Sequence, residues 1–317
     1  MKKILLTFLS TSIVLTSFSQ SEIISGDVAQ AEKLIEAYFT PMAESFGAGL
    51  NNGWYNTAKP HSLGGFDVTF TLNSVIIPNS AENFNIQDAG GNIFTSNNNE
   101  ASTIFGSKET TQMMYVPDDG NTAGIGIPFE MPGGLKTPTM PLPMIQAGVG
   151  LIKNTDLSIR YMPMLNVSDN INVNLFGVGI KHDLLQWIPG IGDAIPMSLS
   201  LQGGYTSLNT ELKVVGQQVA LSTKATTINL IASKKILMVT GYAGIGYNSA
   251  ITKFSADANF ELNGIAFNEK IEMDFASNKD LRTNIGLRIN MAIVTIQADY
   301  TFAKYPTATL GLGVSLR

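Results

Sequence analysis

The chain has 317 residues and a formal net charge of −5 at pH 7, with 44% hydrophobic residues, 14% charged residues and no cysteine. The absence of cysteine excludes disulfides, thiolate metal ligands and cysteine nucleophiles, and the acidic balance excludes the basic footprint that nucleic acid requires. Because soluble domains usually contain about 25% charged residues, the low charge content predicts that much of the surface faces a membrane.

Residues 1–19 have the layout of a secretory signal peptide. Two lysines precede an apolar run from Ile4 to about Val14, and small residues follow that permit cleavage after Ser19. No cysteine follows the run, which excludes the lipid anchor of a lipoprotein. We therefore expect an exported protein.

Residues 20–65 are predicted to form an N-terminal helix followed by an elbow. Between Asp27 and Phe46 apolar residues recur three and four positions apart, which is the spacing of an amphipathic helix. Pro41 is expected to kink this helix. Two placements remain open: the helix packs on the rim or in the lumen of a larger fold, or it acts as a mobile plug. We favour the packed helix.

The elbow has the sequence GWYNTAKPH and leads from the helix to the first strand. Its residues Trp54, Tyr55 and His61 are candidate ligand-binding or lumen residues. Aromatic residues at a membrane boundary fix the depth of a protein in the bilayer, and Pro60 lets the backbone turn sharply. We prefer this anchoring role to that of a ligand gate.

Residues 66–317 are predicted to form a β-barrel. No stretch after residue 19 has the roughly 18 consecutive apolar residues that a transmembrane helix needs. A closed barrel is the other structure that satisfies every backbone polar group in lipid, and its signature is about ten residues of alternation per strand. The first strand is expected at 66–77, FDVTFTLNSVII, and the stretch at about 79–141 is expected to be a long insertion.

From Pro143 onward the alternation of apolar and polar residues is nearly continuous. In DLRTNIGLRINM the apolar residues Leu281, Ile285 and Leu287 face one way, and polar residues such as Arg282 face the other. A soluble sandwich also alternates, but its surface is usually more charged. Separate strands are expected at 145–151, 157–162, 171–181, 197–207, 225–233, 236–248, 250–260, 269–276, 280–291, 292–302 and 306–317. The sequence therefore predicts an all-β fold, a transmembrane antiparallel β-barrel of about 12–14 strands with an N-terminal amphipathic helix.

The helix, the GWYNTAKPH elbow, the GGFDVTF first strand and the terminal GLGVSLR together resemble a group of uncharacterised Gram-negative outer-membrane proteins over most of the mature chain. Those proteins are in turn similar to the long-chain fatty acid transporter (FadL-like) barrels, in which a short N-terminal segment plugs a barrel of about fourteen strands. The resemblance implies an outer-membrane location, with membrane lipid, lipopolysaccharide and the barrel assembly machinery as partners. Arg317 stands where many such barrels end on an aromatic insertion signal.

Sequence motifs for catalysis and for metal or cofactor binding are missing. The only histidines, His61 and His182, flank different strands, and a serine–histidine–aspartate site needs an imidazole within hydrogen-bond reach of a serine. The PDDGN segment lacks the downstream glutamate of a calcium loop. We therefore expect no enzyme activity, no metal and no cofactor, unless one of the histidines lies within reach of a serine and a carboxylate.

The polar face of the later strands supplies candidate lumen residues. If residue 289 pairs with residue 292, the register places Arg282 opposite Asp299 as an ion pair inside the lumen. Such a pair could brace the wall or form part of a selectivity ring, and we favour the bracing role. The candidate lumen residues on the strands are Arg160, Arg282, Arg288, Gln297 and Asp299.

Two functions are compatible with these features. The first is passive uptake of a small hydrophobic compound, as the resemblance to the fatty acid transporters implies. The second is a structural or surface-interaction protein with a filled barrel, whose 79–141 region meets a partner or the envelope. Fold analogy alone does not choose between them, but they differ in whether a path lined by apolar side chains runs through the barrel.

Overall fold

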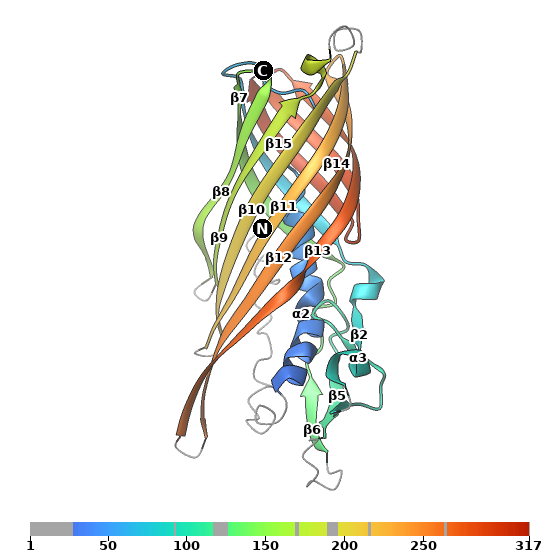
Figure 1. Cartoon of the computed structure of the whole chain (residues 1–317), viewed down its shortest axis with the longest axis vertical. Coiled ribbons are helices and arrows are strands. Elements are labelled where there is room, and N and C mark those ends of the chain that lie inside the picture. Colours follow the sequence, from blue (N-terminus) through green and yellow to red (C-terminus); the bar gives the residue numbers. More distant parts are fainter. Residues whose placement is uncertain are drawn as a thin grey trace.

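The protein folds as a closed antiparallel β-barrel with an N-terminal helix, which confirms the predicted fold class. The computed structural model describes residues 28–91, 93–116, 126–168, 171–188, 196–214, 217–262 and 265–316. Ten strands form the barrel in the order β1-β15-β14-β13-β12-β11-β10-β9-β8-β7 (Figure 1). The first and last strands of the chain therefore lie side by side, because β1 pairs with β15 on one edge and with β7 on the other. The predicted signal peptide, residues 1–19, lies outside the described residues.

Ten of the strands form the barrel, and the other elements lie before it or in the connections between its strands. The barrel strands are β1 (Phe66–Ile76), β7 (Thr139–Leu151), β8 (Thr155–Ser168), β9 (Ile171–Asp183), β10 (Ser198–Val214), β11 (Gln217–Ile236), β12 (Val239–Leu262), β13 (Ile265–Met291), β14 (Val294–Phe302) and β15 (Thr307–Leu316). The remaining elements are α2 (Val28–Leu50), η2 (Asn79–Ala81), β2 (Asn83–Asn85), α3 (Ile86–Gly90), β3 (Phe94–Thr95), β4 (Glu100–Ser102), β5 (Thr111–Tyr115), β6 (Ile127–Met131) and η3 (Leu185–Trp187).

The expected count of 12–14 strands is wrong, because several strands are much longer than a membrane crossing requires. A transmembrane strand needs about 9–11 residues, whereas β12 has 24 and β13 has 27. The segments predicted at 236–248 and 250–260 both lie largely within β12. The same residues therefore make fewer and longer strands, and β10 to β13 project beyond the rest of the wall in Figure 1.

The predicted pairing of Arg282 with Asp299 is also wrong. Ile289 pairs with Ile296, so Gly286 is the residue opposite Asp299. The connection from β13 to β14 consists of residues 292 and 293, and Ala292 has a φ of 55°. A two-residue turn of this kind usually carries glycine or asparagine at the left-handed position, and the sequence gives no such signal there.

The two ends of the barrel differ. At one end β7–β8, β11–β12 and β13–β14 are joined by connections of two or three residues, and the described chain ends at residue 316. We call this the short-turn end. At the other end a connection of 62 residues, 77–138, joins β1 to β7, and β10 to β13 project past their neighbours (Figure 1). We call this the long-loop end.

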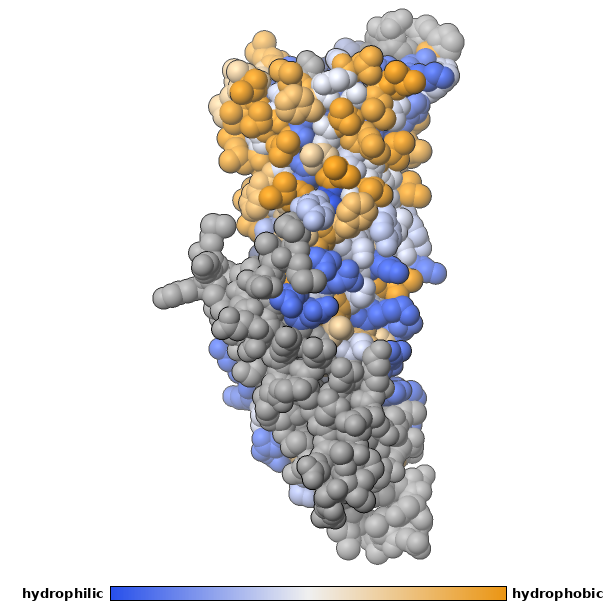
Figure 2. All heavy atoms as spheres, turned by 90° about the vertical axis from the view of Figure 1, so that its left-hand side faces the viewer, coloured by the Kyte–Doolittle hydropathy of each residue, from blue (hydrophilic) through white to orange (hydrophobic). Residues whose placement is uncertain are grey.

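An apolar belt surrounds the barrel near the short-turn end. Ile285 and Leu287 point outward and are 60% and 59% exposed, while Arg282 and Arg288, which alternate with them, are 4% and 2% exposed. Figure 2 shows apolar side chains over the upper wall and polar ones below it. The apolar side of the strands thus faces outward and the polar side faces the lumen, as expected of a barrel in lipid. None of the described helices combines the length and hydropathy that crossing a bilayer requires.

At the long-loop end, α2 and the insertion at 77–138 share one hydrophobic core with the projecting strands. The insertion contains two small sheets, β2-β4 and β3-β5-β6. Phe39 of α2 stacks on Phe254 of β12 with ring centroids 5.6 Å apart. The neighbouring ring of Tyr38 packs edge-on against Phe39, and Tyr38 Oη donates to Gly133 O of the insertion at 2.9 Å. Burial raises the pKa of Tyr38 to about 12. Helix α2 is therefore held between the wall and the insertion.

Candidate functional site: a lumen filled by the elbow

The segment between α2 and β1, residues 51–65, runs inside the barrel. We keep the name elbow for it. Trp54 is 5% exposed, Tyr55 is 6% exposed and His61 is 3% exposed. The preferred anchoring role of Trp54 and Tyr55 at the membrane boundary is therefore wrong, because both rings are surrounded by lumen side chains and not by the bilayer interface.

Two arginines of the wall hold the C-terminal end of α2. Arg160 on β8 donates from Nη1 to Leu50 O at 2.8 Å and from Nη2 to Asn52 O at 2.7 Å. Arg282 on β13 donates from Nη1 to Asn51 O at 2.8 Å. The last carbonyls of a helix have no hydrogen-bond partner within it and carry the negative end of its dipole. The two guanidinium groups therefore supply donors to these carbonyls and place positive charge beside the negative end of the dipole.

Arg160 also fixes the indole of Trp54. Its guanidinium lies 3.6 Å from the centroid of the ring, a cation–π contact. Gln146 on β7 links the two, since its Oε1 accepts from Arg160 Nε at 3.0 Å and its Nε2 donates to Trp54 O at 3.2 Å. No carboxylate is hydrogen-bonded to Arg160 among the described residues, so carbonyls and a π face balance this buried charge.

Two glycines make room for the same indole. A Cβ atom on Gly179 of β9 would lie 2.6 Å from a ring atom of Trp54, and one on Gly204 of β10 would lie 2.5 Å from another. The two residues are paired in the register of these neighbouring strands. Trp54 therefore fills a recess in the wall that only residues without a side chain leave open.

A second contact region surrounds Arg282. Its Nη2 donates to Asn52 Oδ1 at 2.7 Å, and Thr301 Oγ1 donates to the same oxygen at 2.7 Å. Asp299, the expected partner of Arg282, instead accepts from Tyr242 Oη at 2.8 Å. Arg282 therefore braces the elbow against the wall, and does not brace β13 against the neighbouring strand β14.

The remaining candidates lie further along the elbow. Arg288 Nη1 donates to Asn56 Oδ1 at 2.7 Å, and Tyr55 Oη donates to Asn284 Oδ1 at 2.8 Å. Gln297 is 3% exposed and faces the same space. All eight candidate site residues named from the sequence therefore lie in the lumen.

The backbone of the elbow is fixed beyond Asn56 as well. Ser233 Oγ on β11 accepts from Ala58 N at 2.9 Å, and Ser200 Oγ on β10 donates to Ala58 O at 2.5 Å. Further on, Gly64 N donates to Gly150 O at 3.0 Å. Each successive part of the elbow thus has its own partner on the wall.

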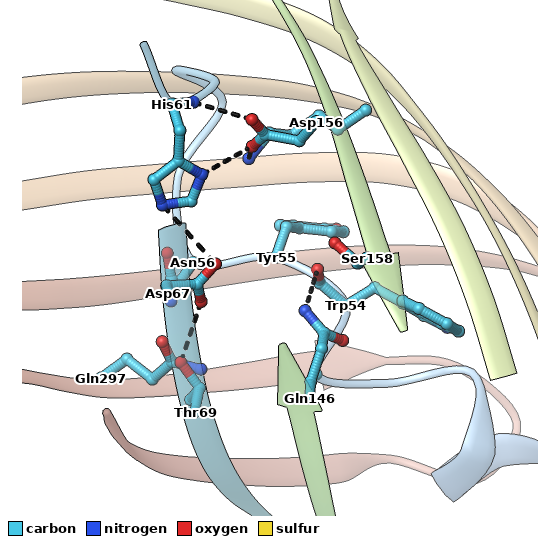
Figure 3. A pocket seen from close by; sticks show the side chains of 12 residues that line it. Trp54, Tyr55, Asn56, His61, Asp67, Thr69, Gln146, Asp156, Ser158 and Gln297 are labelled. Atoms are coloured by element: carbon cyan, nitrogen blue, oxygen red, sulfur yellow. Dashed lines mark hydrogen bonds and ion pairs between the residues drawn. The ribbon is translucent and has the colours of Figure 1, made fainter. Parts of the chain in front are cut away.

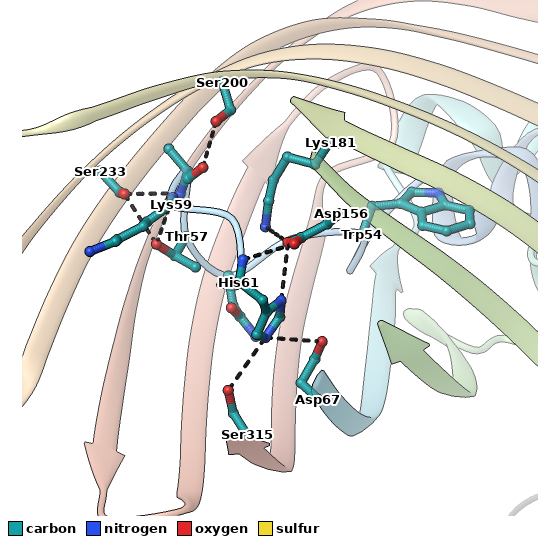
Figure 4. Close-up of polar contacts among 12 residues, drawn as sticks. Trp54, Thr57, Lys59, His61, Asp67, Asp156, Lys181, Ser200, Ser233 and Ser315 are labelled. Atoms are coloured by element: carbon teal, nitrogen blue, oxygen red, sulfur yellow. Dashed lines mark hydrogen bonds and ion pairs between the residues drawn. The ribbon is translucent and has the colours of Figure 1, made fainter. Parts of the chain in front are cut away.

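His61 stands at the centre of a charged cluster near the short-turn end (Figure 4). Its backbone N donates to Asp156 Oδ1 at 2.8 Å, its Nδ1 lies 3.1 Å from Asp156 Oδ2, and Lys181 Nζ lies 2.9 Å from that same oxygen. On the other edge of the ring, His61 Nε2 lies 3.5 Å from both Asp67 Oδ1 and Ser315 Oγ.

An enzyme activity is expected only if a histidine lies within reach of a serine and a carboxylate. His61 lies near both Ser315 and two carboxylates. Ser315 is 7% exposed, however, and Asp67 competes with it for the same ring nitrogen. A nucleophile has to be reachable by its substrate and have a site for the reacting atom beside it. What the cluster can do as it stands is fasten the end of the elbow to β1, β8 and β9.

His182 belongs to a separate contact outside the lumen. Its Nδ1 lies 2.8 Å from Thr155 Oγ1, and its Nε2 accepts from Trp187 Nε1 at 2.8 Å. Trp187 is 60% exposed, in keeping with the interfacial turn expected from its sequence. The two histidines are therefore not part of one site.

A small polar cavity of about 20 Å³ lies between the elbow and the wall, which is room for about one water molecule. Figure 3 shows Asp67, Asp156, Tyr55 and Gln297 around it. The described residues contain no group of three or more histidine or acidic side chains placed to hold a metal ion. This cavity is therefore small and mostly polar, which does not suit a hydrophobic compound.

Several lumen residues were not named as site candidates from the sequence. Gln146, Asp156 and Lys181 all point inward from strands whose alternation was recognised, so the parity of each strand carried a signal for them. Asn52 carried no such signal, because its partners Arg282 and Thr301 are more than 200 residues away along the chain.

Three solved barrel structures illustrate what the chain is similar to. The translocator domain of the autotransporter NalP from Neisseria meningitidis has 9% identity and a TM-score of 0.29, with 93% of this chain and 99% of that chain covered. The outer membrane protease OmpT from Escherichia coli has 7% identity and a TM-score of 0.32, with coverage of 80% and 97%. The toluene transporter TbuX from Ralstonia pickettii has 8% identity and a TM-score of 0.24, with coverage of 86% and 98%.

At the level of sequence, one family profile matches nearly the whole chain. It is described as a family of unknown function (DUF6588), and the match spans residues 1–316. No curated protein matches the chain.

Proposed function

The chain belongs to the family of unknown function DUF6588, and we propose that it is a sealed barrel of the Gram-negative outer membrane that carries a folded module at its long-loop end. The module consists of α2, the insertion at 77–138 and the projecting parts of β10 to β13. Its role is structural or interactive, the second of the two functions derived from the sequence. The barrel supplies the anchor and the elbow supplies the seal.

The observation that carries this proposal is the grip of Arg160 and Arg282 on the end of α2. A segment that has to leave the lumen for transport would expose two buried guanidinium groups and three backbone carbonyls at once. Breaking buried charged hydrogen bonds is strongly unfavourable. The contacts therefore favour a permanently occupied lumen.

The location rests on the signal-like N-terminus together with the outward apolar belt. An exported chain whose closed barrel presents apolar side chains to its surroundings fits the outer membrane, where such barrels reside. Membrane lipid, lipopolysaccharide and the assembly machinery are the partners that this location brings. The buried state of Ser315 and His61 supports a role without catalysis.

Passive uptake of a small hydrophobic compound, by analogy with FadL-like barrels, is the second candidate. One observation favours it: at the boundary between elbow and wall, Asn51 Oδ1, Trp54 Nε1 and Gln297 Oε1 have no hydrogen-bond partner among the described residues. Buried polar groups are normally paired, so the fit of the elbow is incomplete. Uptake would require this side of the elbow to move.

Flux through reconstituted protein separates the two candidates. We expect planar bilayers containing the wild-type chain to show no steady conductance, and vesicles containing it to admit a hydrophobic dye no faster than empty vesicles. The double variant Arg160→Ala/Arg282→Ala is expected to open channels, because the elbow loses its two strongest contacts. Lys253→Ala, which breaks an exposed ion pair with Asp274, is the control and should stay closed. Faster dye entry with the wild type would overturn the sealed barrel and establish uptake.

A further inference from the structure

The turns at the short-turn end carry exposed apolar side chains. Leu237 and Met238 form the β11–β12 turn and are 88% and 57% exposed, Ile152 in the β7–β8 turn is 69% exposed, and Ile293 in the β13–β14 turn is 53% exposed. Turns that face water are usually built from glycine, asparagine, aspartate or serine. Each of these three turns therefore exposes at least one apolar side chain, although the β7–β8 turn also holds Asn154 at a φ of 46°.

Local backbone preference does not explain these residues. Leu237 has a φ of 55°, and Ala292 in the β13–β14 turn has the same value. This left-handed region favours glycine or asparagine and disfavours a leucine. A leucine that is both conformationally disfavoured and 88% exposed indicates that its surroundings are not water.

The height of the belt places the turns at the membrane boundary. The nine residues of β14 rise roughly 23 Å along the membrane normal, at about 3.4 Å per residue and a tilt of about 40°. The apolar band of an outer-membrane barrel is about 25 Å tall, so β14 spans it only if the residues of its turn reach the edge of the hydrocarbon. Figure 2 shows apolar atoms continuing up to the short-turn rim.

Positive charges accompany the apolar turn residues. Lys153 follows Ile152, and Lys234 and Lys235 lie just before the Leu237 turn, all three exposed. The carboxylates of Asp67 and Asp156 are turned into the lumen, where they contact His61 and Lys181. Lys153, Lys234 and Lys235 are thus exposed, while Asp183, whose backbone N donates to Asn154 O of the β7–β8 turn, is half-buried. Lysine side chains beside apolar surface extend their ammonium groups to the lipid headgroups.

From these observations we propose that the turns at the short-turn end dip into the headgroup layer of the adjacent leaflet, where Lys153, Lys234 and Lys235 bind the phosphate-bearing headgroups of anionic phospholipids. The proposal depends on the membrane location above but not on whether the lumen is sealed. It is supported by the continuity of the turns with the apolar belt and by complementary charge, since basic side chains near a membrane surface attract anionic lipid.

The depth of the turns can be measured with single cysteines, because the chain has none of its own. The variants Leu237→Cys, Ile285→Cys and Gln87→Cys, each labelled with an environment-sensitive fluorophore, are reconstituted in phosphatidylcholine vesicles and titrated with aqueous iodide. Residue 285 lies in the belt, and residue 87 is exposed on α3 at the long-loop end. We expect the label at 237 to be quenched several-fold less than the label at 87.

The outcomes separate this inference from the membrane location. If the label at 237 is quenched as strongly as the one at 87 while 285 stays protected, the barrel lies in the membrane but the turns do not, and the inference is overturned. If 285 is quenched as well, the membrane location itself is wrong.

Lipid preference tests the lysines. In vesicles of one part phosphatidylglycerol to two parts phosphatidylcholine, we expect the wild type to bind spin-labelled phosphatidylglycerol at least about five-fold more strongly than spin-labelled phosphatidylcholine, the preference that even one interfacial lysine produces at about 1 kcal/mol. The triple variant Lys153→Gln/Lys234→Gln/Lys235→Gln should lose this preference. The matched triple Lys108→Gln/Lys136→Gln/Lys253→Gln, with exposed lysines elsewhere, should keep it. No preference in the wild type would overturn headgroup binding and point to a protein partner at these turns.

Discussion

Arg160 Nη1 and Leu50 O lie 2.8 Å apart although 110 residues separate them in the chain. This contact joins a strand of the wall to the last turn of α2. Arg160 and Arg282 together hold the end of α2 and the start of the elbow inside the barrel. The variants below test how much the fold depends on it.

Replacing Arg160 with methionine should lower the stability of the folded barrel. The methionine keeps apolar volume but leaves the carbonyls of Leu50 and Asn52 buried without a donor, at a cost of about 3 kcal/mol. The measurement is the urea midpoint of the refolded chain in detergent or lipid. The urea midpoint of Arg160→Lys should lie between those of the wild type and Arg160→Met, because an ammonium group cannot donate to both carbonyls as the planar guanidinium does. An unchanged midpoint for Arg160→Met would show that the helix end does not rely on this contact.

Gly204→Ala should displace Trp54. The new methyl group would lie 2.5 Å from an indole atom, so the ring has to leave its recess and its contact with Arg160. We expect a change in the near-ultraviolet circular dichroism of the tryptophan band and a leaky barrel in the dye assay. Gly203→Ala is the matched control, since its methyl group would meet only Ile180 Cγ2 at 3.9 Å. Equal behaviour of the two variants would argue against the recess.

Ser233→Ala should loosen the middle of the elbow without opening the barrel. Loss of the bond that Ala58 N donates to Ser233 Oγ removes about 1 kcal/mol, which corresponds to roughly five-fold faster hydrogen exchange at the Ala58 amide. Thr223→Val removes a bond between two wall residues, Thr223 and Thr252, and should leave that amide unchanged. Equal exchange in wild type and Ser233→Ala would mean that Ser233 does not hold the elbow.

The module at the long-loop end should lose stability in alkali through Tyr38. Its pKa of about 12 in the folded chain lies above the ordinary value of 10, so the folded state favours the neutral phenol. This contribution is complete below pH 10 and is lost as the pH rises from 10 to 12. Tyr38→Phe lacks it and also lacks the bond to Gly133, so the variant should start less stable and change less between pH 10 and 12. Urea midpoints of both chains across that range check the prediction.

The fold could be predicted from the sequence as far as local periodicity determines it. Alternation along residues such as Ile285 and Arg288 fixed which side faces out, because a period of two leaves only two faces. The number of strands could not be obtained this way. Nothing in the alternation of β12 marks where a strand leaves the membrane and continues as a projecting ribbon.

Which side chains face the lumen could be predicted, but their contacts could not. The alternation of side chains along the strands identified Arg160 and Arg282 as facing inward, and the composition of residues 53–61 identified the elbow. The contacts of these arginines depend on the end of α2, which comes from the N-terminal part of the chain and enters the barrel. The register of β13 with β14 depends on a turn at Ala292 that has no glycine or asparagine signal. Residues far apart in sequence meet only through the closed topology, which single-sequence periodicity does not contain.

The position of β1 has a consequence for the order of assembly. This strand follows the elbow directly at Phe66 and forms the seam with β15, which comes after all the other described strands in the chain. Once the seam has formed, the elbow is enclosed by the wall, and its arginine partners sit on β8 and β13. Threading must therefore precede closure, so the seal is a product of folding and not a later addition to a finished pore.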